Sequence, residues 1–102
     1  MDAYPEIAER FGHNLLRARS RADISQEELA FRADVHRTEV SQLERGLRVP
    51  RIDTVLKLAA ALEASLDELI EGIGWRAPRR QGGGFELAEV TQPQGPKRGE
   101  GE

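Results

Sequence analysis

The stretch VHRTEVSQLERG at residues 35–46 carries side chains that can read the edges of DNA bases. Arginine can bind guanine O6 and N7, glutamine can bind adenine N6 and N7, and a threonine methyl can contact a thymine methyl. Val40 and Leu43 are spaced as the buried side of a short helix. The polar side chains that then face outward or lie at its margins are those of His36, Arg37, Thr38, Ser41, Gln42 and Arg45. Such a helix either reads DNA or carries an ordinary solvated face.

A second helix must precede this stretch. Ser25 followed by Glu28 is a capping box, which predicts a helix from Gln26 to about Ala33–Asp34. Gly46 can adopt a positive φ and so end the following helix, expected over about 36–45. A short turn between two such helices is the arrangement of a helix-turn-helix, in which the second helix enters the major groove.

Three further helices complete the predicted domain. Pro5 suits the first turn of a helix over about 5–22, Pro50 precedes one over about 52–63, and Ser65 opens a last one that Gly72 ends. The residues expected to face inward are Ile7, Phe11, Leu15, Ala18, Ala22, Leu29, Ala30, Ala33, Val40, Leu43, Ile52, Val55, Leu56, Ala59 and Leu62. The prediction is a compact all-α bundle of five helices over residues 1–72.

Residues 73–102 differ in composition and read as a Gly/Pro-rich tail. Within it, FELAEV alternates apolar and polar residues as a strand does, and IGW at 73–75 is a candidate to pair with it. We expect either a short hairpin within 73–90 followed by a disordered end, or a flexible tail with a few apolar residues.

Composition and charge exclude some classes of function for this chain. The net charge of −3 argues against a nucleic-acid partner, but residues 10–57 carry ten Lys/Arg against seven Asp/Glu, a local balance of +3. The chain has no cysteine, and its two histidines lie far apart, so we expect no metal site and no cofactor. No residue set suggests catalysis, and GGG at 82–84 lacks the flanking strand and helix of a phosphate loop. Without a signal peptide or a membrane-length apolar run, a soluble cytoplasmic protein is expected.

The run from Leu16 to Gly72 resembles the Cro/CI-type helix-turn-helix family of phage and bacterial repressors. It contains SQEELA, VSQLERG, PRIDTVLKLAAAL and DELIEG in the order and spacing of that family. The resemblance covers rather more than half of the chain. It implies a lambda-repressor-like fold and a transcriptional regulator, a repressor, that associates with the nucleoid of a prokaryote. It further implies a homodimer that binds double-stranded DNA at an inverted repeat, with half-sites about 10 bp apart.

The resemblance also implies roles for individual residues. Base contacts would come from Arg37, Thr38, Ser41 and Gln42, and phosphate contacts from Gln26, His36, Arg45, Arg48 and Arg51. Arg19 and Glu44 match a structural ion pair.

Four positions depart from the family pattern. Asp23 and Asp34 stand where glycine is usual, in turns that Asp tolerates better than most residues. Glu39 replaces an aromatic or small residue and would either repel phosphate or pair with an arginine. Arg51 replaces the usual Ser/Thr cap, which weakens the cap and favours phosphate contact.

The dimer surface has two candidates, the last helix with Leu66, Leu69 and Ile70, and the tail around Trp75 and Phe85. In either place these residues could instead close the core. A rival interpretation is an antitoxin or adaptor of the same fold, with 73–90 adding as a strand to a partner protein. A restriction–modification controller is another.

Overall fold

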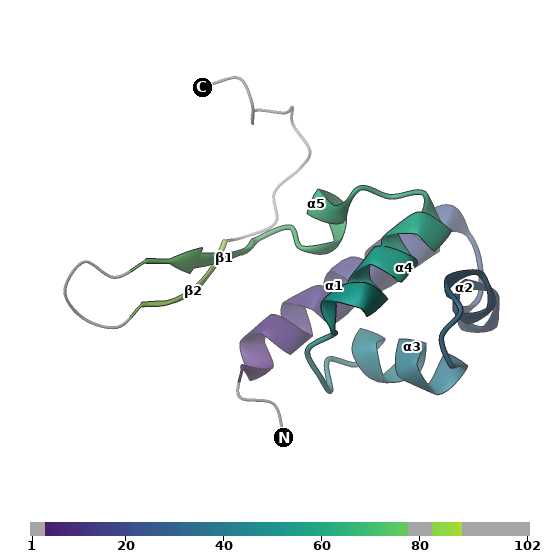
Figure 1. Ribbon diagram of the computed structural model, residues 1–102, viewed down its shortest axis with the longest axis horizontal. Coiled ribbons are helices and arrows are strands. Elements are labelled where there is room, and N and C mark those ends of the chain that lie inside the picture. Colours follow the sequence, from purple (N-terminus) through teal and green to yellow (C-terminus); the bar gives the residue numbers. More distant parts are fainter. Residues whose placement is uncertain (1–3, 78–82, 89–102) are drawn as a thin grey trace.

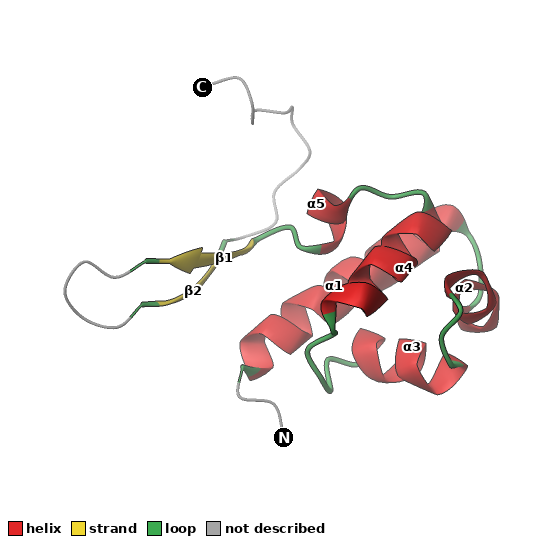
Figure 2. Ribbon diagram, viewed as in Figure 1, coloured by secondary structure: helices red, strands yellow, loops and turns green. Residues whose placement is uncertain are grey.

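The computed structural model describes residues 4–77 and 83–88. In chain order the elements are α1 (Pro5–Ala22), α2 (Gln26–Ala33), α3 (Arg37–Glu44), α4 (Ile52–Leu62), α5 (Leu66–Leu69), β1 (Ile73–Arg76) and β2 (Gly84–Leu87) (Figures 1 and 2). The predicted helical bundle and the predicted hairpin are both confirmed within these residues. The disordered end expected after residue 90 lies outside them. No described helix has the length and apolar character needed to cross a membrane.

The helix ends follow from local chemistry. The hydroxyls of Ser25 and Ser65 each accept a hydrogen bond from the backbone N–H three residues later, at 3.0 and 3.1 Å, so both serines cap their helices as predicted. The return bonds of the predicted capping boxes are not among the described contacts of Glu28 and Glu68, whose carboxylates pair with Arg32 and Arg21. Asp23 and Asp34 adopt left-handed φ values of 60° and 59°, which confirms that these turns survive without glycine. Glu63 does the same at 54°.

The core lies where α1 packs on α3, α4 and α5 while α2 packs on α3 and α4. Its largest fully buried side chains are those of Phe11, Leu15, Leu29, Leu43, Leu58, Leu69 and Val40. Leu69 therefore closes the core. A Cβ on Gly12 would meet the backbone carbonyl oxygens of Leu43 and Glu44, so glycine allows α1 to approach the end of α3 closely.

Three expected core positions are wrong. Ile52 and Leu56 on α4 are 69% and 53% exposed, and Leu58 and Thr54 are buried in their place. Helix α4 carries apolar residues almost all round, and both candidate faces share Val55, so periodicity could not select the buried one. Ala22 is exposed because it lies at the last position of α1, beyond the core.

The two strands form an antiparallel hairpin that pairs Trp75 with Phe85. The ring of Phe85 makes edge contacts with Trp75 and Tyr4, with centroids 5.1 and 4.7 Å apart. The guanidinium of Arg10 on α1 donates to the carbonyl of Ala88, which ties the hairpin base to the helices. The hairpin projects from the bundle on the side away from α2 (Figure 1). Trp75 is 55% exposed and so does not close the core.

Candidate nucleic-acid interface

Helix α3 follows α2 after a three-residue turn. The turn is possible because Asp34 takes the left-handed conformation and the N–H of Val35 donates to the carbonyl of Ala30 at 3.0 Å. Val40 and Leu43 are fully buried, as predicted, so α3 is anchored by one side. Its opposite side is therefore presented to solvent as a polar face.

The polar face of α3 begins at the N-terminus of the helix. Arg37 and Thr38 are exposed, while Ser41 and Gln42 are half-buried along the same helix. His36 caps α3 without a side-chain hydrogen bond, so the first N–H groups of the helix are left for solvent or for a phosphate oxygen. The side chains of Arg37, Thr38 and Ser41 make no hydrogen bond or ion pair within residues 4–77 and 83–88, which leaves them available to a ligand.

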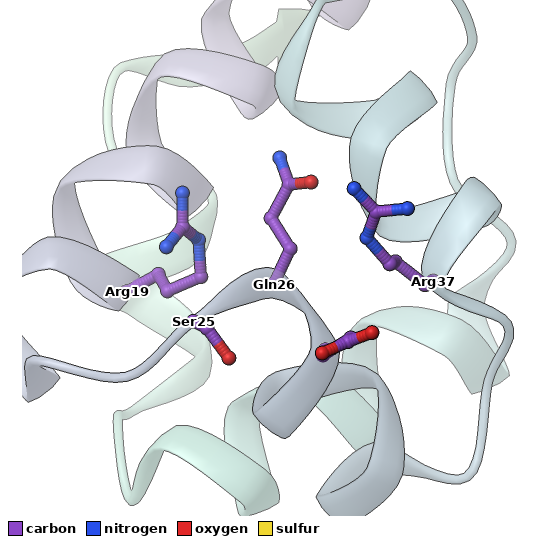
Figure 3. Close-up of a pocket in the computed structure, with 5 residues that line it drawn as sticks. Arg19, Ser25, Gln26 and Arg37 are labelled. Carbon is purple, nitrogen blue, oxygen red and sulfur yellow. The ribbon is translucent and has the colours of Figure 1, made fainter.

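An open hollow of about 420 Å³ adjoins the N-terminus of α2. It is lined by Arg19, Ser25, Gln26, Glu27 and Arg37, and Gln26 lies between the two arginines in Figure 3. Guanidinium groups and a helix N-terminus both attract anions, whereas Glu27 opposes them. The hollow thus has the chemistry of a phosphate site with one acidic neighbour.

Glu44 ties three helices together under this hollow. Its carboxylate accepts from Arg19 Nε at 2.6 Å, from Arg19 Nη2 at 3.0 Å and from Gln26 Nε2 at 2.9 Å. The Glu44 side chain is 4% exposed and that of Arg19 17%. The hydrogen bond with Glu44 raises the pKa of Arg19 above its usual range, against the opposing effect of burial. The expected pairing of Arg19 with Glu44 is thus present, and Gln26 braces α3 while keeping one N–H for a ligand.

The loop after α3 contains three arginines that differ in their hydrogen-bond and ion-pair partners. Arg45 is exposed and has no partner among the described residues. Arg48 donates to Gln42 Oε1 at 3.0 Å, and Arg51 Nε lies 3.2 Å from Asp53 Oδ1. Arg51 forms no side-chain cap on α4, as its departure from Ser/Thr predicts.

Glu39 neither repels phosphate from an outward position nor pairs with an arginine. It is half-buried and accepts a hydrogen bond from Thr54 Oγ1 at 3.3 Å, which links α3 to the start of α4. The expectation for Glu39 is therefore corrected. Neither this link nor the Arg48–Gln42 bond was predicted. Each joins α3 to residues in or beyond the following loop, and the spacing of residues along the chain does not show how that loop folds back.

Most other arginines of the bundle are already neutralised. Arg17 on α1 lies 2.7 Å from Glu71, Arg21 pairs with Glu68, and Arg32 lies 2.8 Å from Glu28. In the described part of the bundle, four guanidinium groups have no carboxylate partner. Arg10 is bonded to a backbone carbonyl and Arg48 to Gln42, while Arg37 and Arg45, at the two ends of α3, have no partner at all in this part of the chain. Three of these four arginines, Arg37, Arg45 and Arg48, thus lie on α3 or in the loop that follows it, although the net charge of the chain is −3.

Comparison with known proteins agrees with this geometry. A family model described as helix-turn-helix matches residues 15–69, more than half of the chain. The control protein C.BamHI from Bacillus amyloliquefaciens is 39% identical over 62 residues, which span 60% of this chain and 76% of that protein. An uncharacterized HTH-type transcriptional regulator, y4dJ, from Sinorhizobium fredii is 39% identical over 59 residues, 58% of this chain and 77% of its own. The crystal structure of the restriction-modification controller protein C.AhdI from Aeromonas hydrophila superposes with a TM-score of 0.63 at 36% identity and covers 66% of this chain and 97% of that one.

Proposed function

Since this chain belongs to the Cro/CI-type helix-turn-helix family and is a DNA-binding transcriptional regulator, we propose that it binds an inverted repeat as a homodimer and acts as a repressor. Each protomer would place α3 in a major groove, with half-sites about one helical turn apart. The family consists of regulators rather than enzymes, and we expect no catalysis, no cofactor and a place in the cytoplasm, where prokaryotic DNA lies.

The distribution of unpaired arginines carries this proposal. Arg37 is free at the leading end of α3, and Arg45 is free at its other end. We assign base contacts to Arg37, Thr38, Ser41 and Gln42, because side chains near the N-terminus of a recognition helix reach base edges first. Phosphate contacts are assigned to Gln26, His36, Arg45, Arg48 and Arg51, which flank that set. Such contacts supply affinity that falls with salt but carry little sequence information.

Exposed apolar side chains on α4 and α5 support a homodimer. Leu56 on α4 is 53% exposed, and Leu66 and Ile70 at the ends of α5 are each 37% exposed. Apolar side chains gathered on adjacent elements are typical of surfaces that bind another protein. We propose that a second copy of the chain covers them.

The experiment is selection of binding sites from a random duplex pool at near-physiological salt. The expected outcome is an enriched inverted repeat whose two halves are read by two copies of α3. If no sequence is enriched and retention disappears as salt rises, binding is purely electrostatic and the proposed specificity is wrong.

A second candidate, which keeps the same DNA-reading site, is a controller of a restriction–modification system. The similarity to C.BamHI and to the controller C.AhdI favours this candidate. The matched part of this chain covers 97% of C.AhdI. The selected repeat should then lie upstream of genes for a restriction endonuclease and a DNA methyltransferase. Selected sites at unrelated promoters would exclude it.

The antitoxin or adaptor interpretation depends on the hairpin instead. Trp75 is 55% and Phe85 37% exposed there, and both strands lie beyond the residues that the family model matches. A protein partner bound through 73–90 stays a prediction. It would be tested by whether Trp75→Ala releases a partner that co-purifies with the chain.

A further inference from the structure

The orientation of the Gln42 side-chain amide is set by Arg48. Arg48 Nη1 donates to Gln42 Oε1 at 3.0 Å, from the loop that follows α3. A guanidinium has only donors, so the atom that faces it must be the amide oxygen of Gln42. The amide nitrogen, with its two N–H groups, is then the part of Gln42 that has no partner in the described residues.

This orientation changes which base Gln42 matches. An adenine edge requires the amide to accept from N6–H and to donate to N7 at the same time. The bond from Arg48 occupies one of the two lone pairs of the amide oxygen, and the guanidinium charge beside that oxygen opposes the approach of the adenine N6–H donor to the other. The free N–H groups of Gln42 and Arg48 therefore favour a base edge that offers acceptors. Guanine offers two acceptors, O6 and N7, in the major groove.

We propose that Arg48 is a specificity-determining residue, which holds Gln42 as a hydrogen-bond donor and directs it to guanine rather than adenine. The inference rests on the proposed function, because it presumes that α3 reads bases. It goes beyond the phosphate contact assigned to Arg48, since a phosphate contact alone affects all sequences alike.

The test compares site selections by the unmodified chain and by its Gln42→Ala, Arg48→Ala and Arg48→Lys variants. Gln42→Ala identifies the base position that Gln42 reads, because the selected sites should no longer show a preferred base at that position. The unmodified chain should prefer guanine there, and Arg48→Ala should shift the preference toward adenine, with about a tenfold change in the guanine-to-adenine affinity ratio. Arg48→Lys keeps one charged donor and should retain most of the guanine preference.

Arg45→Ala is the matched control, because Arg45 is a neighbouring exposed arginine without a bond to Gln42. It should weaken binding to all sites equally. Thermal melting confirms that each variant folds.

Three outcomes overturn the inference while leaving the proposed function intact, and the first two concern the unmodified chain and Arg48→Ala. They are an adenine preference in the unmodified chain, and an Arg48→Ala variant that loses affinity uniformly, as Arg45→Ala does. Failure of Gln42→Ala to alter any position also rejects it. If the unmodified chain selects no sequence at all, the proposed function itself fails.

Discussion

The arginine side chains divide into those that hold the fold together and those that remain free. Arg17, Arg19 and Arg21 on α1 each pair with a carboxylate from a later part of the chain, whereas Arg37 has no partner among the residues described. An unpaired arginine loses no internal contact when it binds DNA, whereas a paired one must break its ion pair. The pairing pattern thus shows which arginines can bind a ligand without losing an internal ion pair, which charge counting cannot show.

Replacing Arg37 with alanine should weaken binding to the selected site by about 1–3 kcal/mol and relax preference at one base position. The physical reason is the loss of an unpaired guanidinium at the leading end of α3. Fluorescence anisotropy with base-substituted duplexes measures both effects. The control is Arg76→Ala, which removes the same charge from the hairpin. The Arg76 side chain is 72% exposed there. Equal losses for both variants would show that Arg37 contributes charge but no base contact.

Replacing Glu44 with alanine should lower the free energy of unfolding by about 3 kcal/mol. The value is at the lower end for a buried pair because 17% of the Arg19 side chain reaches solvent. Urea denaturation provides the measurement. The control is Glu28→Ala, which removes an exposed pair with Arg32 and should cost less than about 1 kcal/mol. Similar costs would mean that the Arg19–Glu44 pair is no more stabilising than a surface pair.

The pH dependence of this pair follows from the raised pKa of Arg19. A group whose pKa is raised in the folded state contributes stability that is present below its unfolded pKa. That contribution is lost only as pH rises through the higher folded value. The Arg19 contribution should therefore be constant throughout the neutral range.

At the scale of elements, the position of α3 depends on how closely α1 approaches it. Gly12 lies where these helices meet, and the Glu44 pair and the Thr54–Glu39 hydrogen bond hold α3 from two further sides. Helix α3 has eight residues, too few to be stable in isolation. Its geometry as a DNA-reading element is therefore imposed by the elements around it.

Replacing Gly12 with alanine should destabilise the fold by about 1–3 kcal/mol. The added Cβ would press on backbone carbonyl oxygens at the end of α3, which cannot move away as a flexible side chain can. Thermal denaturation measures the effect. Gly74→Ala is the control, because a Cβ there meets no atom within 4 Å. An unchanged melting temperature in Gly12→Ala would show that α1 and α3 can separate without cost, contrary to the packing described.

At the scale of the whole molecule, the DNA-reading helix and the proposed dimer surface lie on different elements. Arg37 and Arg45, which have no partner among the described residues, lie at the two ends of α3, while Leu56, Leu66 and Ile70 of the proposed dimer surface belong to α4 and α5. One helix-turn-helix contacts few base pairs, so two copies are needed to specify a long site. The arrangement allows a dimer to form without covering α3.

Replacing Ile70 with aspartate should convert a dimer into a monomer, because a charge cannot be buried in an apolar interface without a partner. Analytical ultracentrifugation should show half the mass, and affinity for the inverted repeat should fall toward that for a single half-site. Phe31→Asp is the control, since Phe31 is 82% exposed on α2 and should not affect the mass. A monomeric unmodified chain, or an unchanged mass in Ile70→Asp, would refute the dimer surface on α5.

The sequence by itself determined the helices, their caps and the outward face of α3. The serine caps at Ser25 and Ser65 and the spacing of Val40 and Leu43 depend on residues within one or two turns, so local chemistry suffices. For Gly12 and Trp75, in contrast, local sequence does not determine the surroundings of the residue. Whether each is enclosed or exposed depends on elements far away in the chain.

The tertiary structure alone decided which face of α4 is buried, which arginines are free and how Gln42 is oriented. Ile52 and Leu58 are equally apolar, but the positions of α1 and α2 select Leu58 for the core. Arg37 and Arg19 have the same chemistry, yet Glu44 from the end of α3 neutralises Arg19 and leaves Arg37 available. Charge and hydrogen-bond partners are properties of proximity in space, and proximity across loops is not encoded in spacing along the chain.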